Sequence, residues 1–218
     1  MSGIQAMMFN SASGPTLTFN GSYQSNTSAT SVSTSFSIGA ANSTRVVIIA
    51  FGAGKDSGGF ASNPYSSVTI GGVSATLAVY SNVNTATAAV IYYASVPTGT
   101  SATVSFSIAA ACHPILVDCW SATDLSSSTP SATNGTGGTA TSQSVSLTIP
   151  SSGFAIGCVG SASNSPTLSS WTNMTAQTAY SQSNGAIWTA SYNISGAATR
   201  TANFTSSIGA DLVVAAWS

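Results

Sequence analysis

Charge is the scarcest property of this sequence. Only 3% of its 218 residues are charged, against about a quarter in an ordinary soluble domain. Glutamate is absent, and three basic and four acidic side chains give a formal net charge of −1 at pH 7. The charged residues are Arg45, Lys55, Asp56, Asp118, Asp124, Arg200 and Asp211. Such a chain lacks the basic surface that nucleic-acid binding needs, so we expect no nucleic-acid partner.

Long apolar runs are missing as well. No stretch reaches the roughly 20 apolar residues of a membrane-spanning helix, so we expect no membrane partner. The opening segment, MSGIQAMMFN, has neither a basic region nor a long apolar region, and it therefore differs from a secretory signal. We expect a protein that is made and kept in a cytoplasm, or one that leaves the cell within a released particle.

Cysteine and histidine are too sparse for the common metal sites. Cys112, Cys119 and Cys158 are odd in number and lack disulfide-framework spacing, so free and buried thiols are predicted. The only cluster with metal-ligand chemistry is Cys112, His113, Asp118 and Cys119. Zinc usually takes four ligands in recognisable pairs, which this cluster does not offer. We predict no metal and no cofactor.

The sequence also offers no recognisable set of catalytic residues. A serine-histidine-aspartate triad would have to use His113, with Asp118 or Asp124 as the orienting carboxylate, and no Gly-x-Ser-x-Gly turn marks a nucleophile. Four carboxylates in the whole chain disfavour the paired acids of a glycosidase. Lys55 and Asp56 lie in a glycine-rich segment without the spacing of a phosphate-binding loop. We predict a protein that is not an enzyme and has no catalytic residue.

What the sequence does contain is strict alternation of apolar and hydroxyl side chains, typical of strands with one buried and one wet face. This pattern runs through residues 32–38, 103–108 and 144–149. Other segments are apolar on both faces and are predicted to be central strands or strands covered by a neighbouring subunit. They are residues 45–51, 90–93, 115–117 and 212–217. Because the last of these ends the chain, we expect the C-terminus to be held in the core.

Turn residues separate these strands. Gly71-Gly72 supplies the positive φ angles of a type I′ hairpin, and further reversals are predicted at 97–100 and 150–153. No window shows helical periodicity with caps. We predict an all-β fold with minimal helix, an antiparallel β-sandwich of jelly-roll-like type with about ten to twelve strands. We expect an N-terminal arm (1–15), a single domain (16–218) around one core, and irregular segments at 52–64 and 124–141.

Aromatic side chains are the main candidates for binding. A neutral surface that carries tyrosine or tryptophan suits a sugar ring or a protein partner. Trp188 and Tyr192 share a strand face with Ala190 and Ile194 and are predicted to belong to the core. Tyr65 and Trp171 lie near predicted loops, and we take them as weak candidates for contact with a partner or a glycan.

The order of strands and turns resembles a β-sandwich module found in bacteriophage virion proteins and bacterial surface proteins. The resemblance covers roughly residues 40–217 and rests on 44–49, 68–73, 90–93, 97–100 and 103–106. The opening residues 4–9 also resemble the short leaders of some phage tail and fibre proteins. The resemblance implies particle assembly, surface decoration or host attachment, with residues 1–15 as a docking arm, and it carries no catalytic residue. A frayed terminus is the alternative for that segment.

The leading hypothesis is a non-enzymatic bacteriophage virion protein that decorates the capsid or forms part of the tail fibre or tip. Its expected partners are copies of itself and other virion proteins, since a nearly neutral surface gives weak electrostatic protection against association. The alternative is a monomer that stays in solution because of its abundant hydroxyl and amide groups. Other candidates are a glycan-binding module for host attachment and a subunit of an extracellular filament, located at the cell surface or outside the cell.

Overall fold

The computed structural model describes residues 14–55, 60, 62–83, 87–161, 163, 167–183, 185–193 and 195–218, except for the side chain of Lys55. Within these ranges every regular element is a β-strand and every pairing is antiparallel, so the predicted all-β antiparallel class is confirmed. No helix there is long and apolar enough to cross a membrane. The predicted arm lies outside the described residues except for Gly14 and Pro15.

The first sheet is built around one long strand, β8. The sheet has the order β5-β4-β8-β3-β7-β6, and β1 and β2 also pair with β8. The first half of β8 pairs with β2 and β4, and its second half pairs with β1 and β3. The strands are β1 (Thr16–Ser25), β2 (Ala29–Ser37), β3 (Val46–Lys55), β4 (Tyr65–Ile70), β5 (Val73–Ser74), β6 (Thr76–Ser81), β7 (Thr87–Ser95) and β8 (Ser101–Thr123).

The first sheet folds over on itself. Phe106 in the first half of β8 stacks on Phe51 of β3, with ring centroids 4.5 Å apart, although β3 pairs with the second half of β8. The two halves of β8 therefore face each other across an apolar layer.

The second sheet repeats this arrangement around β14. Its order is β11-β14-β10-β13-β12, and β9 also pairs with β14. The register between β9 and β14 breaks between Asn203 and Ile208, and Leu147 from one side of this break shares a core cluster with Val214 from the other. The strands are β9 (Ala132–Ile149), β10 (Phe154–Ser161), β11 (Leu168–Thr172), β12 (Thr175–Gln182), β13 (Gly185–Tyr192) and β14 (Gly196–Trp217).

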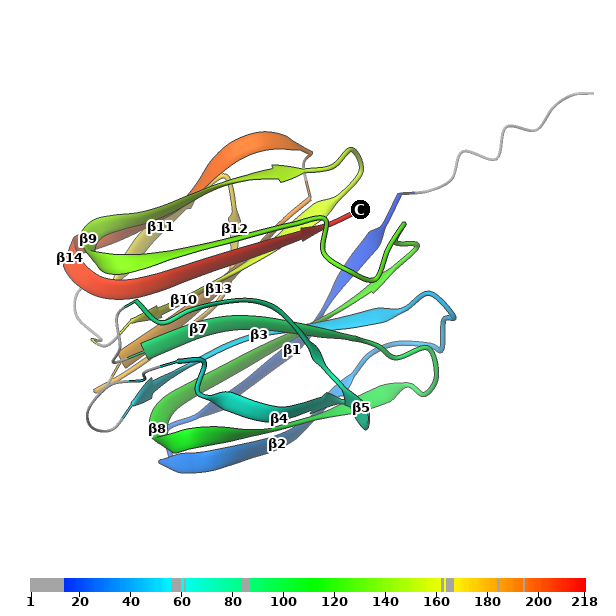
Figure 1. Cartoon of the computed structure of the whole chain (residues 1–218), viewed down its shortest axis with the longest axis horizontal. Helices are drawn as coiled ribbons and strands as arrows, with labels where there is room; N and C mark the ends of the chain where they lie inside the picture. Colours follow the sequence, from blue (N-terminus) through cyan, green and yellow to red (C-terminus); the bar gives the residue numbers. More distant parts are fainter. Residues whose placement is uncertain are drawn as a thin grey trace, which may run out of the picture.

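Three apolar clusters, and not the single core that was expected, hold the described part of the chain together. One lies inside the folded first sheet and one inside the folded second sheet. The third lies between the sheets and joins residues of β3, β7 and β8 to residues of β10, β13 and β14. Figure 1 shows β9–β14 stacked on β1–β8. The three clusters arise because β8 and β14 are each long enough to belong to two layers.

The predicted central strands are confirmed. Val47 and Ile49 of β3 face the cluster inside the first sheet, whereas Val46 and Ile48 face the cluster between the sheets. A strand covered on both faces buries every side chain, which is why this segment does not alternate. Trp217 is also fully buried, so the C-terminus is held in the core as predicted. In the alternating segments the apolar residues are buried and most of the serines and threonines are exposed.

The predicted turns are confirmed too. Gly71 and Gly72 have φ angles of 60° and 79° and join β4 to β5, a backbone that a side chain would strain. In the turn between β9 and β10, the Gly153 amide donates to the Pro150 carbonyl over 2.9 Å. A Cβ at Gly153 would also collide with the carbonyl of Trp217, so this turn packs tightly on the last strand.

Three strand assignments differ from the sequence-based prediction. The described residues contain fourteen strands, more than the ten to twelve expected, in part because the run after the Gly71-Gly72 hairpin divides into β5 and β6 and because the short β11 lacks a recognisable pattern. The segments 52–64 and 124–141 are not wholly irregular, since β3 continues to Lys55 and β9 begins at Ala132. Glycines in β9 argue against a strand by propensity, but pairing with β14 overrides this preference. Gly137 is needed there, because a Cβ would lie 2.8 Å from Cβ of Val83.

Candidate functional site

The few charges of this protein are mostly inside it. Arg45, Asp118, Arg200 and Asp211 are buried, and Asp124 is exposed. The side chains of Lys55 and Asp56 lie outside the described residues. Across the portion of the surface that the structure describes, Asp124 is therefore the only charged side chain exposed to solvent.

Arg45 is held by carbonyl oxygens instead of a carboxylate. Its guanidinium donates to six carbonyls at 2.6 to 3.2 Å. These belong to the segment after β2 and to the turn between β7 and β8, at Ile38, Gly39, Ala40, Val96, Thr98 and Gly99. Burial lowers the pKa of Arg45. This arginine clamps two loops, so its role is structural.

Arg200 has a similar setting with fewer partners. It donates to the carbonyls of Leu147, Ala198 and Gly196, and its guanidinium carbon lies 6.0 Å from the centroid of the Tyr192 ring. Burial lowers the pKa of Arg200 as well. It connects β14 to β9 and, like Arg45, keeps its charge inside the protein.

Both buried aspartates bridge the two sheets through hydroxyl groups. Asp118 of β8 accepts hydrogen bonds from Ser22 of β1 at 2.5 Å and from Thr189 of β13 in the other sheet. Asp211 of β14 accepts from Ser81 of β6 at 2.8 Å and from Thr87 of β7 at 3.2 Å. Desolvation raises the pKa of Asp118, and the hydrogen bonds from Ser22, Thr189 and Thr178 oppose this shift.

Replacing Asp118 by asparagine is expected to remove a pH dependence of stability. A raised folded-state pKa stabilises the fold below the unfolded carboxyl pKa of about 3.9, and this contribution is lost as pH rises through the folded-state value. Asp118→Asn should therefore become more stable relative to the wild type as pH rises, by about 1.4 kcal/mol for each unit by which the pKa is raised. Urea unfolding between pH 3.5 and 8 measures this difference.

The exposed Asp124 supplies the control for that experiment. Asp124→Asn should change the free energy of unfolding little, because the side chain is exposed and surface substitutions of this kind usually stay within about 0.5 kcal/mol. If the wild type instead gained stability over Asp118→Asn with rising pH, the direction assigned to this carboxyl would be wrong.

The structure separates the residues that a catalytic or metal site would need. Asp118 faces the second sheet and accepts from hydroxyls, while the neighbouring Cys119 points into the cluster inside the first sheet. Asp124 lies beyond the end of β8 and is exposed. Among the described residues no group of three or more histidine, cysteine, aspartate or glutamate side chains lies together as a metal site would require.

The three cysteines are buried and form no disulfide with one another, as predicted. Burial raises the pKa of Cys119 to about 12 and that of Cys158 still further. A thiol with such a pKa is protonated at neutral pH and is a poor nucleophile. The cysteines therefore act as small apolar side chains of the core.

The outer faces of the two sheets carry the most regular surface pattern. On β2 and β8, Ser33 lies 3.3 Å from Ser105 and Ser35 lies 2.8 Å from Thr103, hydroxyl to hydroxyl. On β9 and β14 the pairs are Ser144 with Thr201 at 2.8 Å and Ser146 with Thr199 at 3.0 Å. We call these the first and second hydroxyl faces. The sequence showed the alternation in each strand but not which hydroxyls would pair.

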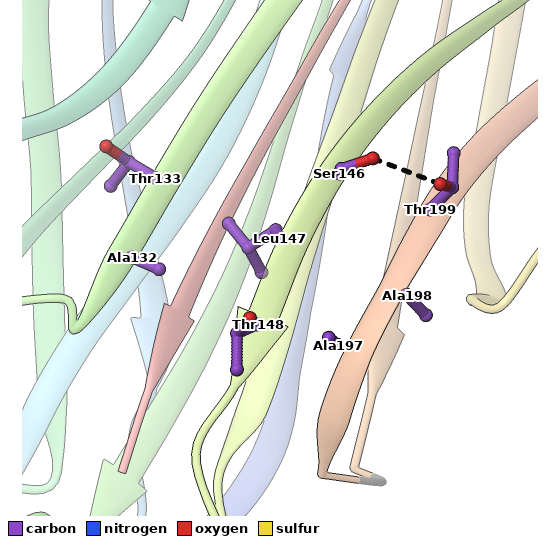
Figure 2. A pocket seen from close by; sticks show the side chains of 8 residues that line it. All are labelled: Ala132, Thr133, Ser146, Leu147, Thr148, Ala197, Ala198 and Thr199. Atoms are coloured by element: carbon purple, nitrogen blue, oxygen red, sulfur yellow. Dashed lines mark hydrogen bonds between the residues drawn. The ribbon is translucent and has the colours of Figure 1, made fainter.

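The second hydroxyl face contains an open concavity of about 530 Å³. Figure 2 shows its lining, with the Ser146 and Thr199 hydroxyls joined across β9 and β14 and Thr133 on the other part of β9. The lining is Ala132, Thr133, Ser146, Leu147, Thr148, Ala197, Ala198 and Thr199. None of these side chains is titratable at neutral pH or aromatic.

The two aromatic candidates have different positions. Tyr65 is only 5% exposed and packs in the core, with its ring centroid 4.6 Å from that of Phe51 and its hydroxyl donating to the Ala88 carbonyl at 3.4 Å. Burial raises its pKa well above the usual value. Its ring has no face available for stacking on a partner. Trp171 is half-buried on β11 and lines a surface pocket with Trp188.

Comparison with known proteins adds no identification. No protein-family model matches the chain, and no curated protein shows significant similarity to it.

Proposed function

We propose that this chain is a non-enzymatic structural subunit that packs against other subunits through uncharged, hydroxyl-lined faces. A bacteriophage particle, in its capsid or its tail, is the assembly we propose, and this part rests on the resemblance of the strand and turn pattern to virion proteins. The observation that carries the proposal is the burial of four of the charged side chains, which leaves Asp124 as the one charge exposed on the described surface.

Because their hydroxyls are paired, the two faces lose little free energy when another subunit covers them. A hydroxyl that loses water without a new partner destabilises a contact by about 1–3 kcal/mol. Ser35 and Thr103 already bond to each other, as do Ser146 and Thr199, so these groups keep a partner when another subunit excludes water. The same faces carry no charge that would have to be desolvated.

A partly exposed sheet edge supports association as well. β6 ends the path of the first sheet and pairs only with β7. Its last residue, Ser81, donates a hydrogen bond to the Thr136 carbonyl of β9, so the second sheet covers this end of the strand, whereas Leu77 near the other end is exposed. Of the exposed large apolar side chains of the described residues, Leu77 and Tyr80 lie on β6 and Val83 lies just after it, whereas Val73 lies on β5 at the other end of the strand order. Exposed apolar residues favour contact with another chain.

A single charge placed on a hydroxyl face is expected to weaken association. Ser35→Asp on the first face and Ser144→Asp on the second would bury an unpaired carboxylate in any contact made there. At least one of the two variants should associate at least tenfold more weakly than the wild type in sedimentation velocity. Both should keep a free energy of unfolding within about 0.5 kcal/mol of the wild type, because exposed positions tolerate substitution.

Ser151→Asp, in the exposed turn after β9, is the matched control and should associate like the wild type. The proposal would fail if both face variants associated as strongly as this control.

A further inference from the structure

A small pocket lies where the two ends of the second sheet approach each other. β11 and β12 occupy opposite ends of the strand order and are joined in sequence only by Asn173 and Met174. The sheet curls and brings them together without a ladder of hydrogen bonds between them. The gap leaves a pocket of about 250 Å³, lined by residues of β11, β12 and β13.

The lining of this pocket combines aromatic, amide and hydroxyl groups and contains no charge. Trp171, Trp188 and Leu168 provide apolar surface, while Gln177 and Ser170 provide polar groups. The Gln177 amide can donate two hydrogen bonds and accept two. The Ser170 hydroxyl already accepts a hydrogen bond from the Asn203 amide at 3.2 Å and can still donate one. Gln177 is exposed, so its amide is accessible to a ligand from solvent.

Trp171 also has a polar group without a partner. Its indole N–H is buried and donates to no acceptor in the structure. A buried tryptophan N–H usually finds an acceptor, and an unsatisfied donor costs about 1–3 kcal/mol. Because this N–H is closed off from solvent, a ligand in the pocket would meet the indole through its ring and not through this donor.

We propose that this pocket binds a neutral sugar ring. A sugar has an apolar C–H face that can lie against the Trp171 indole and hydroxyls that can bond to the Gln177 amide and to the Ser170 hydroxyl. The absence of charge in the lining disfavours phosphates, carboxylates and ammonium groups, which would be desolvated without a counter-charge. The volume lies below the roughly 300–1,000 Å³ of pockets for drug-sized ligands, which limits the occupant to about one ring. Host attachment through such a site goes beyond the proposed assembly role and does not depend on it.

Titration of the purified chain with sugars tests this site. We would follow tryptophan fluorescence and heat of binding with glucose, galactose, mannose and N-acetylglucosamine, and with short oligomers of glucose and N-acetylglucosamine. Glucuronate serves as the charged comparator. At least one neutral sugar should bind at millimolar concentration or below, and glucuronate should bind at least tenfold more weakly. A stronger response to an oligomer than to its monomer would indicate a glycan chain as the ligand, and equal responses would indicate a free sugar.

Variants separate the pocket from adventitious binding. Gln177→Ala and Trp171→Phe should each weaken binding at least tenfold, while Tyr80→Ala removes an exposed aromatic ring on β6 and should leave it unchanged. Far-ultraviolet circular dichroism confirms that each variant is folded. The proposal is overturned if no neutral sugar binds, if glucuronate binds as well as the neutral sugars, or if Gln177→Ala binds like the wild type.

Discussion

Arg45→Met is expected to destabilise the protein by about 3–5 kcal/mol, because buried carbonyl oxygens lose a charged donor and each one left unsatisfied costs about 1–3 kcal/mol. The substitution keeps an unbranched side chain of similar length but leaves six carbonyl oxygens without their donor. Ordinary domains have a free energy of unfolding of about 5–15 kcal/mol, so the expected loss is a large share of the total stability. Urea unfolding followed by tryptophan fluorescence measures it.

Two variants calibrate this result. Arg45→Lys retains the charge with three donors in place of five. Its free energy of unfolding should fall less than that of Arg45→Met. Arg200→Met removes a guanidinium that bonds to three carbonyls. It should also lower the free energy of unfolding by less than Arg45→Met does. An Arg45→Met variant within about 1 kcal/mol of the wild type would show that the two loops hold their positions without the clamp.

Trp217→Ala is expected to cost about 3–5 kcal/mol, although this is the next-to-last residue of the chain. The indole is fully buried between the sheets, with its centroid 5.7 Å from the Phe154 ring and 6.1 Å from the Tyr93 ring. Its N–H donates to the Ser128 carbonyl at 3.1 Å. Alanine would therefore leave a cavity in the cluster that joins the sheets and release the segment before β9.

Trp217→Phe is the conservative comparison, because it keeps a ring in the cluster but loses the bond to Ser128. Trp217→Phe should lower the free energy of unfolding clearly less than Trp217→Ala does. Limited proteolysis reports on the same contact, since the segment before β9 also bonds to the C-terminus: the Ser126 amide donates to the Ser218 carbonyl and the Ser131 amide to the Ala216 carbonyl. Cleavage between 124 and 131 should be faster in both variants, and an unchanged rate would contradict this role.

Local patterns were sufficient to predict the class of the fold. Alternation in strands such as β2 and β9 fixes which side chains are buried, because the period of a strand is two residues. The segments apolar on both faces were correctly assigned to covered strands, and Gly71-Gly72 specified its hairpin directly.

Long-range packing was not predictable from those patterns. Nothing local in β8 or β14 indicates that each strand bends and belongs to two layers. Tyr65 follows a proline in sequence and was expected near a loop, yet pairing of β4 with β8 places its ring beside Phe51. Burial of Arg45 likewise depends on carbonyls that come from two separate loops.

The candidate sites show the same division. Trp171 was selected as an aromatic residue near a loop, but Gln177 was not, because its place beside Trp171 depends on how the second sheet curls. The hydroxyl pairs could not be predicted from the sequence for a similar reason. Serine and threonine are abundant throughout the chain, and only the register identifies which of them meet.

Native mass by light scattering, with electron microscopy of the same samples at several protein and salt concentrations, tests the central claim most directly. We expect defined oligomers or larger arrays whose mass rises with protein concentration and changes little with moderate salt, because uncharged contacts are not screened. A monomer at every concentration, or an assembly that dissociates in moderate salt, would contradict the account of a subunit that packs through neutral hydroxyl faces.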